Sequence, residues 1–176
     1  PAPGVKAFSL HFATKVAMPF KIVIVGTGIA GLGAAIALKD KGHIVTIVEA
    51  TSELQPIGGI ITIQANANRV LDSWGVYESL LKICDAPPFA PGARRYRDGQ
   101  FLIERPPELY KNEYGYPLLH VHRADLQHVL HMAAEARGIT IRLGCPVVAI
   151  NQEGDNVAVV ISSAERIEAD VIVGAD

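Results

Sequence analysis

Between residues 21 and 49, the pattern of hydrophobic positions changes from that of a strand to that of a helix and back again. Residues 21–25 are a short β-branched run that ends at Gly26. Residues 29–41 then carry apolar side chains at helical spacing and are followed by Gly42, a typical C-terminal glycine. Residues 43–49 are a second strand-like run. This order predicts a βαβ unit, in which a right-handed crossover makes the two strands parallel.

The rest of the chain continues as a mixture of helices and strands. We expect further helices at residues 65–74, 77–83 and 124–137, and strands at 118–122, 139–143, 147–151, 157–162 and 169–173. Two more strands, 94–97 and 100–104, are predicted around an Asp98-Gly99 turn, and residues 106–117 are predicted as a loop. The predicted fold class is therefore α/β: a Rossmann-like fold with a parallel sheet, an inserted β-hairpin and an antiparallel strand addition.

The chain has the length of one domain. We expect residues 18–176 to form it, with residues 85–118 as an inserted hairpin and loop. Residues 1–17 contain two lysines and no acidic residue, with apolar residues at helical spacing, which leaves a targeting segment open. We favour an extension ahead of Met18 that is disordered or foreign to the natural chain, because the first strand begins just after Met18.

Composition narrows the class of partner. The net charge of −2 gives no reason to expect nucleic acid or an anionic membrane as a partner, so a small molecule or a cofactor is the better expectation. Cys84 and Cys145 are far apart and in no metal or redox spacing, so we expect free thiols in a reducing, cytoplasmic compartment. The longest near-apolar run, residues 28–38, is too short to span a bilayer.

The strongest chemical signal is a glycine motif between the first strand and the first helix. It reads Gly26-Thr27-Gly28-Ile29-Ala30-Gly31. Gly26 permits a tight turn, Gly28 lets the backbone approach a diphosphate without a Cβ in the way, and Gly31 lets the helix pack closely on the sheet. The amides that open the helix, including those of Ile29 and Ala30, offer unpaired donors and a positive dipole end to that diphosphate.

An acidic residue completes this motif at the end of the second strand. Glu49 lies 18 residues beyond Gly31, and Ala50 follows it. At this position the Glu49 carboxylate can accept hydrogen bonds from an adenosine ribose and repel a 2′-phosphate. A glycine-rich turn alone often serves only as a connection. Because strand, glycines, helix and acid coincide, we expect a dinucleotide to bind here, although these residues do not distinguish FAD from NAD.

Other polar residues give weaker signals. Arg123 and Gln127 are one helical turn apart and can meet a cofactor phosphate or hydroxyl together, the alternative being a solvated surface pair. Four histidines, at positions 120, 122, 128 and 131, come in close pairs, but no carboxylate or thiol completes a ligand spacing, so we expect no metal. No spacing indicates a catalytic acid–base pair or triad, so the catalytic residues stay unknown.

Four segments together resemble flavoprotein monooxygenases of the salicylate hydroxylase and para-hydroxybenzoate hydroxylase group. The first joins residues 25–38, 42–45 and Glu49; the others are residues 58–71, which contain Asn66-Ala67 and Arg69, residues 122–126, and residues 169–176. Their order and spacing are similar to those of the family over residues 20–176. Two departures stand in the second segment, where Ala65 replaces a usual proline and Ile60 a glycine.

This resemblance implies a function as well as an FAD-binding fold. It implies that Arg123 contacts FAD, and that Asp176 lies near the diphosphate and the approach route of a nicotinamide cofactor. The whole enzyme is then expected to use FAD, NAD(P)H and dioxygen to hydroxylate a phenolic or related aromatic small molecule, with a homo-oligomer left open. The alternatives are a catalytically inert cofactor-binding fragment and an NAD-dependent dehydrogenase.

Overall fold

The predicted βαβ unit is confirmed. The computed structural model describes residues 18–84, 92–104, 107–154 and 156–175, so the expectation for residues 1–17 lies outside the described part. Strand β1 (Lys21–Val25), helix α1 (Ile29–Asp40) and strand β2 (Ile44–Val48) follow one another, and β1 and β2 pair in parallel. Gly42 has a φ of 92°, a value that favours glycine, just beyond the end of α1.

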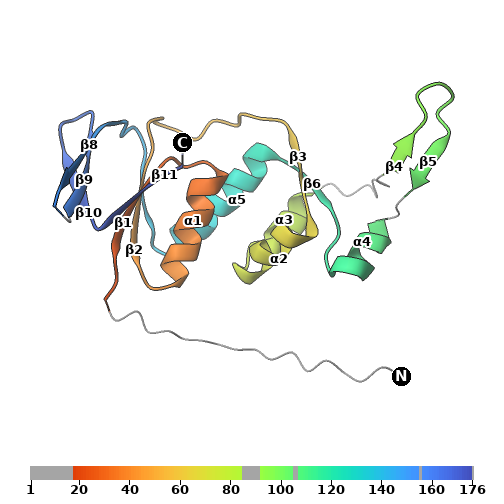
Figure 1. The fold of residues 1–176 in the computed structure, drawn as a ribbon, viewed down its shortest axis with the longest axis horizontal. Coiled ribbons are helices and arrows are strands. Elements are labelled where there is room, and N and C mark those ends of the chain that lie inside the picture. Colours follow the sequence, from red (N-terminus) through yellow and green to blue (C-terminus); the bar gives the residue numbers. More distant parts are fainter. Residues whose placement is uncertain (1–17, 85–91, 105–106, 155, 176) are drawn as a thin grey trace, which may run out of the picture.

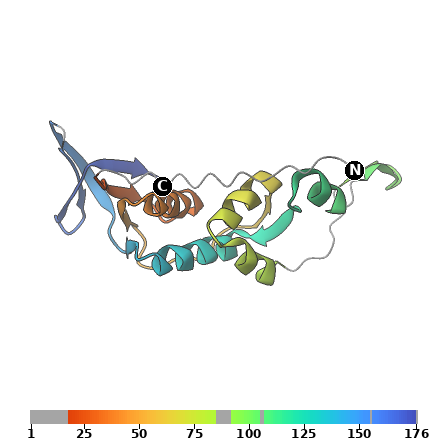
Figure 2. The same cartoon turned by 90° about the horizontal axis from the view of Figure 1, so that it is seen from below.

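A parallel sheet lies at the centre of the fold. Within the described residues its strand order is β11-β1-β2-β7, where β7 is Thr140–Arg142 and β11 is Val171–Gly174. Helices α1 and α5 (Arg123–Ala136) lie side by side on one face (Figures 1 and 2). Side chains alternate along β1, so that Ile22 and Ile24 join the core under the helices while Val23 joins a second core on the other face.

An antiparallel sheet covers that second face. It has the order β10-β9-β8, formed by β8 (Val147–Glu153), β9 (Asn156–Ile161) and β10 (Arg166–Ala169), and Figure 1 shows it across the parallel sheet from the helices. Val159 and Ala169 pack there against Val23 and Val48 of the parallel sheet. This confirms the expected antiparallel addition, and the apolar contact between the two sheets stabilises their stacking.

Two further helices extend the helical layer away from the sheet. They are α2 (Ala65–Ser73) and α3 (Tyr77–Ile83), next to an antiparallel pair of β3 (Ile60–Ile63) and β6 (Leu119–His122). Strand β6 runs directly into α5. Arg137 ties three helices together, because it pairs with Asp40 at the end of α1 at 2.8 Å and donates to the carbonyl of Trp74 after α2 at 2.8 Å.

The inserted segment differs in part from its prediction. A hairpin of β4 (Gly92–Arg94) and β5 (Phe101–Glu104) projects from the end of the molecule away from the parallel sheet (Figure 1). Its strands are shorter than predicted, because residues 95–100 form the turn, in which Gly99 has a φ of 70°. The prediction of a loop over residues 106–117 is wrong: α4 (Pro107–Tyr114) occupies most of it. Pro107 opens this helix, where proline's missing N–H costs nothing.

Two strand predictions are also corrected. The sequence predicted no strand over residues 60–63, yet they form β3, whose pairing with β6 is non-local. Residues 169–173 were expected as one strand, but the chain changes sheets at Asp170, between β10 and β11. The side chain of Asp170 accepts from the amide of Lys21 at 2.6 Å, and its own amide donates to the Lys21 carbonyl, so this corner is fixed to the start of β1.

A search of the described helices for a membrane span finds none that is both long and apolar enough.

Candidate cofactor-binding site

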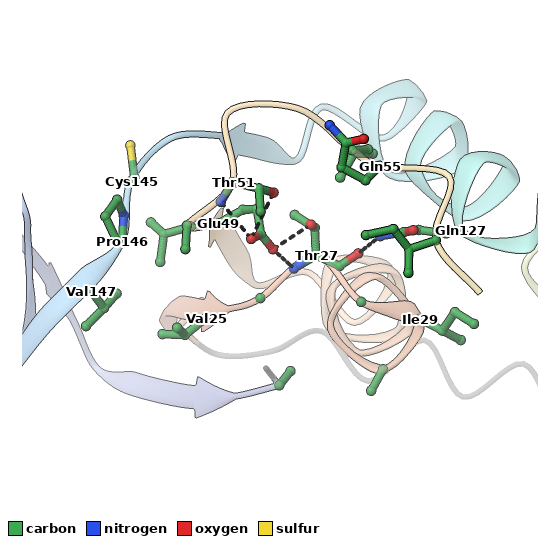
Figure 3. A pocket seen from close by; sticks show the side chains of 18 of the residues that line it. Val25, Thr27, Ile29, Glu49, Thr51, Gln55, Gln127, Cys145, Pro146 and Val147 are labelled. Carbon is green, nitrogen blue, oxygen red and sulfur yellow. Dashed lines mark hydrogen bonds between the residues drawn. The ribbon is translucent and has the colours of Figure 1, made fainter. Parts of the chain in front are cut away.

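A pocket of about 870 Å³ opens at the carboxyl ends of β1 and β2 (Figure 3). In a parallel sheet of this type, ligands bind at this edge because the strand ends, the turns and a helix N-terminus meet there. Most of the predicted cofactor residues line the pocket, namely Gly26, Gly28, Ile29, Ala30, Glu49, Ala50, Arg123 and Gln127. Gly31 lies just behind them in α1, and Asp176 falls outside the described residues.

The three glycines of the motif differ in why the backbone has glycine at each position. Gly26 has a φ of 110°, and its amide donates to the carbonyl of Val48 at 2.8 Å, so the turn is tight. A Cβ on Gly31 would lie 2.1 Å from the Gly26 carbonyl oxygen. Gly28 is extended, with φ −62° and ψ 171°, and among the described residues a Cβ there would meet only the Ala175 carbonyl oxygen, at 3.6 Å. The protein therefore needs glycine at 26 and 31, but not at 28.

The start of α1 is electropositive and lacks a capping side chain. Gly28 is the N-cap residue and can offer no side-chain acceptor, and the first turn of the helix contains no acidic residue. The amides of this turn thus point their partial positive charge at the pocket without a competing carboxylate. An anion placed there would receive hydrogen bonds from the backbone and be stabilised by the helix dipole.

Glu49 is held by four hydrogen bonds from two threonines (Figure 3). Its Oε2 accepts from the amide of Thr27 at 2.8 Å and from the Thr27 hydroxyl at 2.7 Å. Its Oε1 accepts from the amide of Thr51 at 2.9 Å and from the Thr51 hydroxyl at 3.1 Å. Burial raises the pKa of this carboxyl, but these hydrogen bonds outweigh it and lower the pKa from 4.5 to about 2, so Glu49 is ionised at neutral pH.

Arg123 and Gln127 both line the pocket, from the first turns of α5. Gln127 Nε2 donates to the Thr27 carbonyl at 2.9 Å, so it holds the glycine turn itself. Arg123 begins α5, its amide donates to the Gly59 carbonyl at 3.0 Å, and its aliphatic stem packs on Gly58. Within the described residues Arg123 has no carboxylate partner, which leaves a cation at the pocket wall that the fold does not neutralise.

Sequence reasoning missed several residues of the pocket. Thr27 and Thr51 went unnoticed, although a hydroxyl inside a glycine motif and another two residues beyond its acid were visible signals. The loop after β2, the segment before β8 and the first residue of β8 also contribute, through residues that carry no recognisable motif: Leu54, Gln55, Ile57, Cys145, Pro146 and Val147. These residues reach the pocket through tertiary packing that a local pattern does not reveal.

Other candidate residues lie apart from the pocket. His122 Nδ1 accepts from the amide of Ala124 and so caps α5, and His131 lies 3.6 Å from Glu135 on the same helix. Among the residues that the structure describes, no three His, Cys, Asp or Glu side chains come together as metal ligands. Tyr116 donates to Asp72 at 2.7 Å, on the α2 side of the molecule. Of the two free thiols, Cys84 packs on the first core, whereas Cys145 packs on the second core and also lines the pocket.

Comparison with known proteins agrees with this geometry. A family model described as an FAD binding domain matches residues 20–176. The FAD-dependent monooxygenase OpS4 of Beauveria bassiana (strain ARSEF 2860) is 35% identical over 162 residues, which are 90% of this chain and 37% of that protein. Asperlicin C monooxygenase of Petromyces alliaceus is 33% identical over 159 residues, covering 89% of this chain and 33% of that protein.

A solved structure gives the same result for the fold. The tetrameric form of 2-methyl-3-hydroxypyridine-5-carboxylic acid oxygenase matches with a TM-score of 0.74 and 30% identity, over 90% of this chain and 39% of the other. The chain thus spans little more than a third of the length of the relatives that it matches. With the Rossmann-like sheet, the glycine turn and a family match over residues 20–176, this chain belongs to the FAD binding domain family.

Proposed function

We propose that this chain is the FAD-binding part of a monooxygenase that uses NAD(P)H and dioxygen to hydroxylate a phenolic or related aromatic small molecule. The FAD part of this proposal is supported by the family match and by relatives that are named FAD-dependent monooxygenases. An aromatic substrate is supported by the structural match to an oxygenase of a hydroxypyridine carboxylic acid. The observation that carries the proposal is Gly28, a glycine that the protein fold does not itself need.

The residues present fit the diphosphate of FAD. Gly28 leaves open the place where a Cβ would stand at the uncapped start of α1, and the backbone of Ile29, Ala30 and Gly31 forms the first helical turn. In this proposal Gly26 shapes the turn, and the amides beyond it donate to phosphate oxygens. The free cation of Arg123 adds charge to the same pocket, where a phosphate is the partner that it lacks.

The other residues fit the adenosine half and the geometry of the turn. We propose that Glu49 accepts from the ribose and that Ala50 contributes its backbone beside it. Gln127 donates to the Thr27 carbonyl, so we propose that it positions the glycine turn, while Arg123 contacts the anion. Asp176 stays a proposal by resemblance alone, since the structure does not describe it.

When bound, FAD supplies the redox chemistry, in which it accepts electrons from NAD(P)H and activates dioxygen. The protein contributes position, electrostatics and exclusion of water. The chain's described residues place a fixed carboxylate, a free guanidinium and the amides of one helix end around a single pocket. These groups bind and orient the cofactor, and we assign no catalytic residue among them.

Four wider expectations belong to the same proposal. We propose that residues 18–176 form one FAD-binding domain into which residues 85–118 are inserted, and that residues 1–176 without the rest of the protein have no turnover. A homo-oligomer of the full-length protein is supported by the tetrameric relative. A cytoplasmic location is supported by the free thiols of Cys84 and Cys145.

The full-length protein provides the test. After purification it should carry the absorbance of a bound flavin, and it should oxidise NADH or NADPH faster when a suitable phenol is present, with consumption of dioxygen and release of a hydroxylated product. A colourless protein that binds nicotinamide would indicate a dehydrogenase instead. A yellow protein without oxidation of either nicotinamide, across a panel of phenols, would indicate a cofactor-binding protein without turnover.

A further inference from the structure

The carboxylate of Glu49 has no acceptor position open for a ligand. A carboxylate offers about four lone-pair positions for hydrogen bonds. In Glu49 two donors lie on Oε1 and two on Oε2, all from Thr27 and Thr51 (Figure 3). A hydroxyl group that arrives from the pocket can therefore bind this carboxylate only if one of the four donors leaves.

The four donors are not equally easy to remove. Two are backbone amides, which move only if the chain moves. Thr27 is only 1% exposed, and its hydroxyl makes the shortest of the four bonds. The Thr27 carbonyl is in addition fixed by Gln127. Thr51 is exposed, and its hydroxyl makes the longest bond, at 3.1 Å. Rotation about one side-chain bond would release this hydroxyl into water without moving any backbone.

We propose that the Thr51 hydroxyl is a placeholder on Oε1 of Glu49, which a ribose hydroxyl of the adenosine half of FAD displaces, while Thr27 is a positioning residue that keeps Oε2 fixed. The inference rests on the proposed function, because it takes FAD as the ligand. The exchange replaces one O–H donor with another, so the carboxylate keeps its four hydrogen bonds with and without the cofactor. The displaced Thr51 hydroxyl is exposed and forms a hydrogen bond with water, so no buried donor is left unpaired.

This arrangement explains how Glu49 can stay ionised in a partly buried pocket when no cofactor is bound. Among the described residues that line the pocket, the other titratable side chains are those of Arg123 and Cys145, but the groups that hold Glu49 are the two threonines. Without the cofactor, Thr51 keeps the carboxylate satisfied and oriented. The two donors of Thr27 and the amide of Thr51 keep the carboxylate in place when the Thr51 hydroxyl leaves.

Two matched substitutions test the proposal, because Thr→Val removes a hydroxyl and keeps the shape. In the full-length protein, stripped of flavin, FAD binding is measured by the quenching of flavin fluorescence. Thr51→Val should bind FAD about two- to tenfold more tightly than the wild type, since no placeholder must leave. Thr27→Val should bind FAD about tenfold more weakly, and Thr27→Ser, which restores the hydroxyl, should bind it as the wild type does.

ADP serves as a second probe, because it keeps the adenosine and the diphosphate and lacks the flavin. The same order of affinities is expected for ADP, with thermal unfolding of the variants as the check that each is folded. If Thr51→Val binds FAD no better than the wild type, or if Thr27→Val binds it equally well, the inference is wrong. If the wild type itself binds no FAD, the proposed function fails first and this inference fails with it.

Discussion

Gly31 and Gly28 lie three residues apart in one turn, yet the structure predicts that the same substitution costs much more stability at Gly31 than at Gly28. In Gly31→Ala the new Cβ would lie 2.1 Å from the Gly26 carbonyl oxygen and 3.1 Å from the Gly26 carbonyl carbon. Both atoms belong to the backbone of the turn that joins β1 to α1, so no side chain can yield. The turn must open by roughly 1 Å to restore van der Waals contact.

The magnitude follows from two opposing effects. Overpacking of this kind costs typically about 1–3 kcal/mol, and the backbone clash puts Gly31→Ala at the upper end of that range. Alanine in a helix gains about 1 kcal/mol over glycine. We therefore expect the free energy of unfolding to fall by about 2 kcal/mol, measured by urea titration of the full-length protein in the absence of FAD.

Gly28→Ala is the matched control for this experiment. Within the part of the chain that the structure describes, its Cβ would meet only the Ala175 carbonyl oxygen at 3.6 Å, and the φ and ψ angles of Gly28 suit any residue. Loss of a glycine N-cap should cost about 1 kcal/mol or less. The reasoning is refuted if Gly31→Ala is as stable as the wild type, or if the two variants lose equal stability.

Two further predictions concern the rest of the pocket. Gly58→Ala should weaken FAD binding about tenfold, because its Cβ would lie 2.9 Å from Cδ of Arg123 and its φ of 129° disfavours alanine. Gly59→Ala, whose Cβ would meet no atom of the described residues within 4 Å, should leave FAD binding unchanged. Equal affinities of the two variants in a fluorescence titration would contradict this. The folded-state pKa of Glu49, about 2, lies below its ordinary value of 4.5, so its stabilisation is present above pH 4.5 and is lost as the pH falls toward 2. After solvent screening, the stabilisation by the ionised carboxylate amounts to about 1–2 kcal/mol. The difference in the free energy of unfolding between the wild type and Glu49→Gln should therefore shrink between pH 5 and 3. A difference that stays constant in urea titrations over this range would refute the prediction.

Local patterns predicted the elements that short-range periodicity determines. The bounds of β1, α1, β2 and α3 follow the sequence closely, because each lies between glycines or begins after a turn with its own signal. Helix α4 was missed because residues 106–117, which begin with two prolines, were predicted as a loop. Its ring contact between Tyr110 and Tyr114, at i and i+4, was a helical signal that composition concealed.

Non-local pairing was beyond these patterns. Strand β3 is only four residues long and exists because β6, far along the chain, pairs with it. The corner at Asp170 depends on the Lys21 backbone, 149 residues away in sequence. In the pocket, the glycines and Glu49 carry a spacing that can be recognised, and the two threonines beside them were signals that went unnoticed. The bond from Gln127 to the turn becomes visible only when α5 is placed in space.

One measurement bears most directly on the claim that the start of α1 binds the diphosphate of FAD. It is the dissociation constant for FAD of Gly28→Ala, set against that of the wild-type full-length protein, with urea stability confirming that the variant is folded. We predict a loss of affinity of about tenfold or more with nearly unchanged stability, since the new Cβ is accommodated by the protein but stands where the diphosphate must approach. An unchanged dissociation constant would contradict the claim.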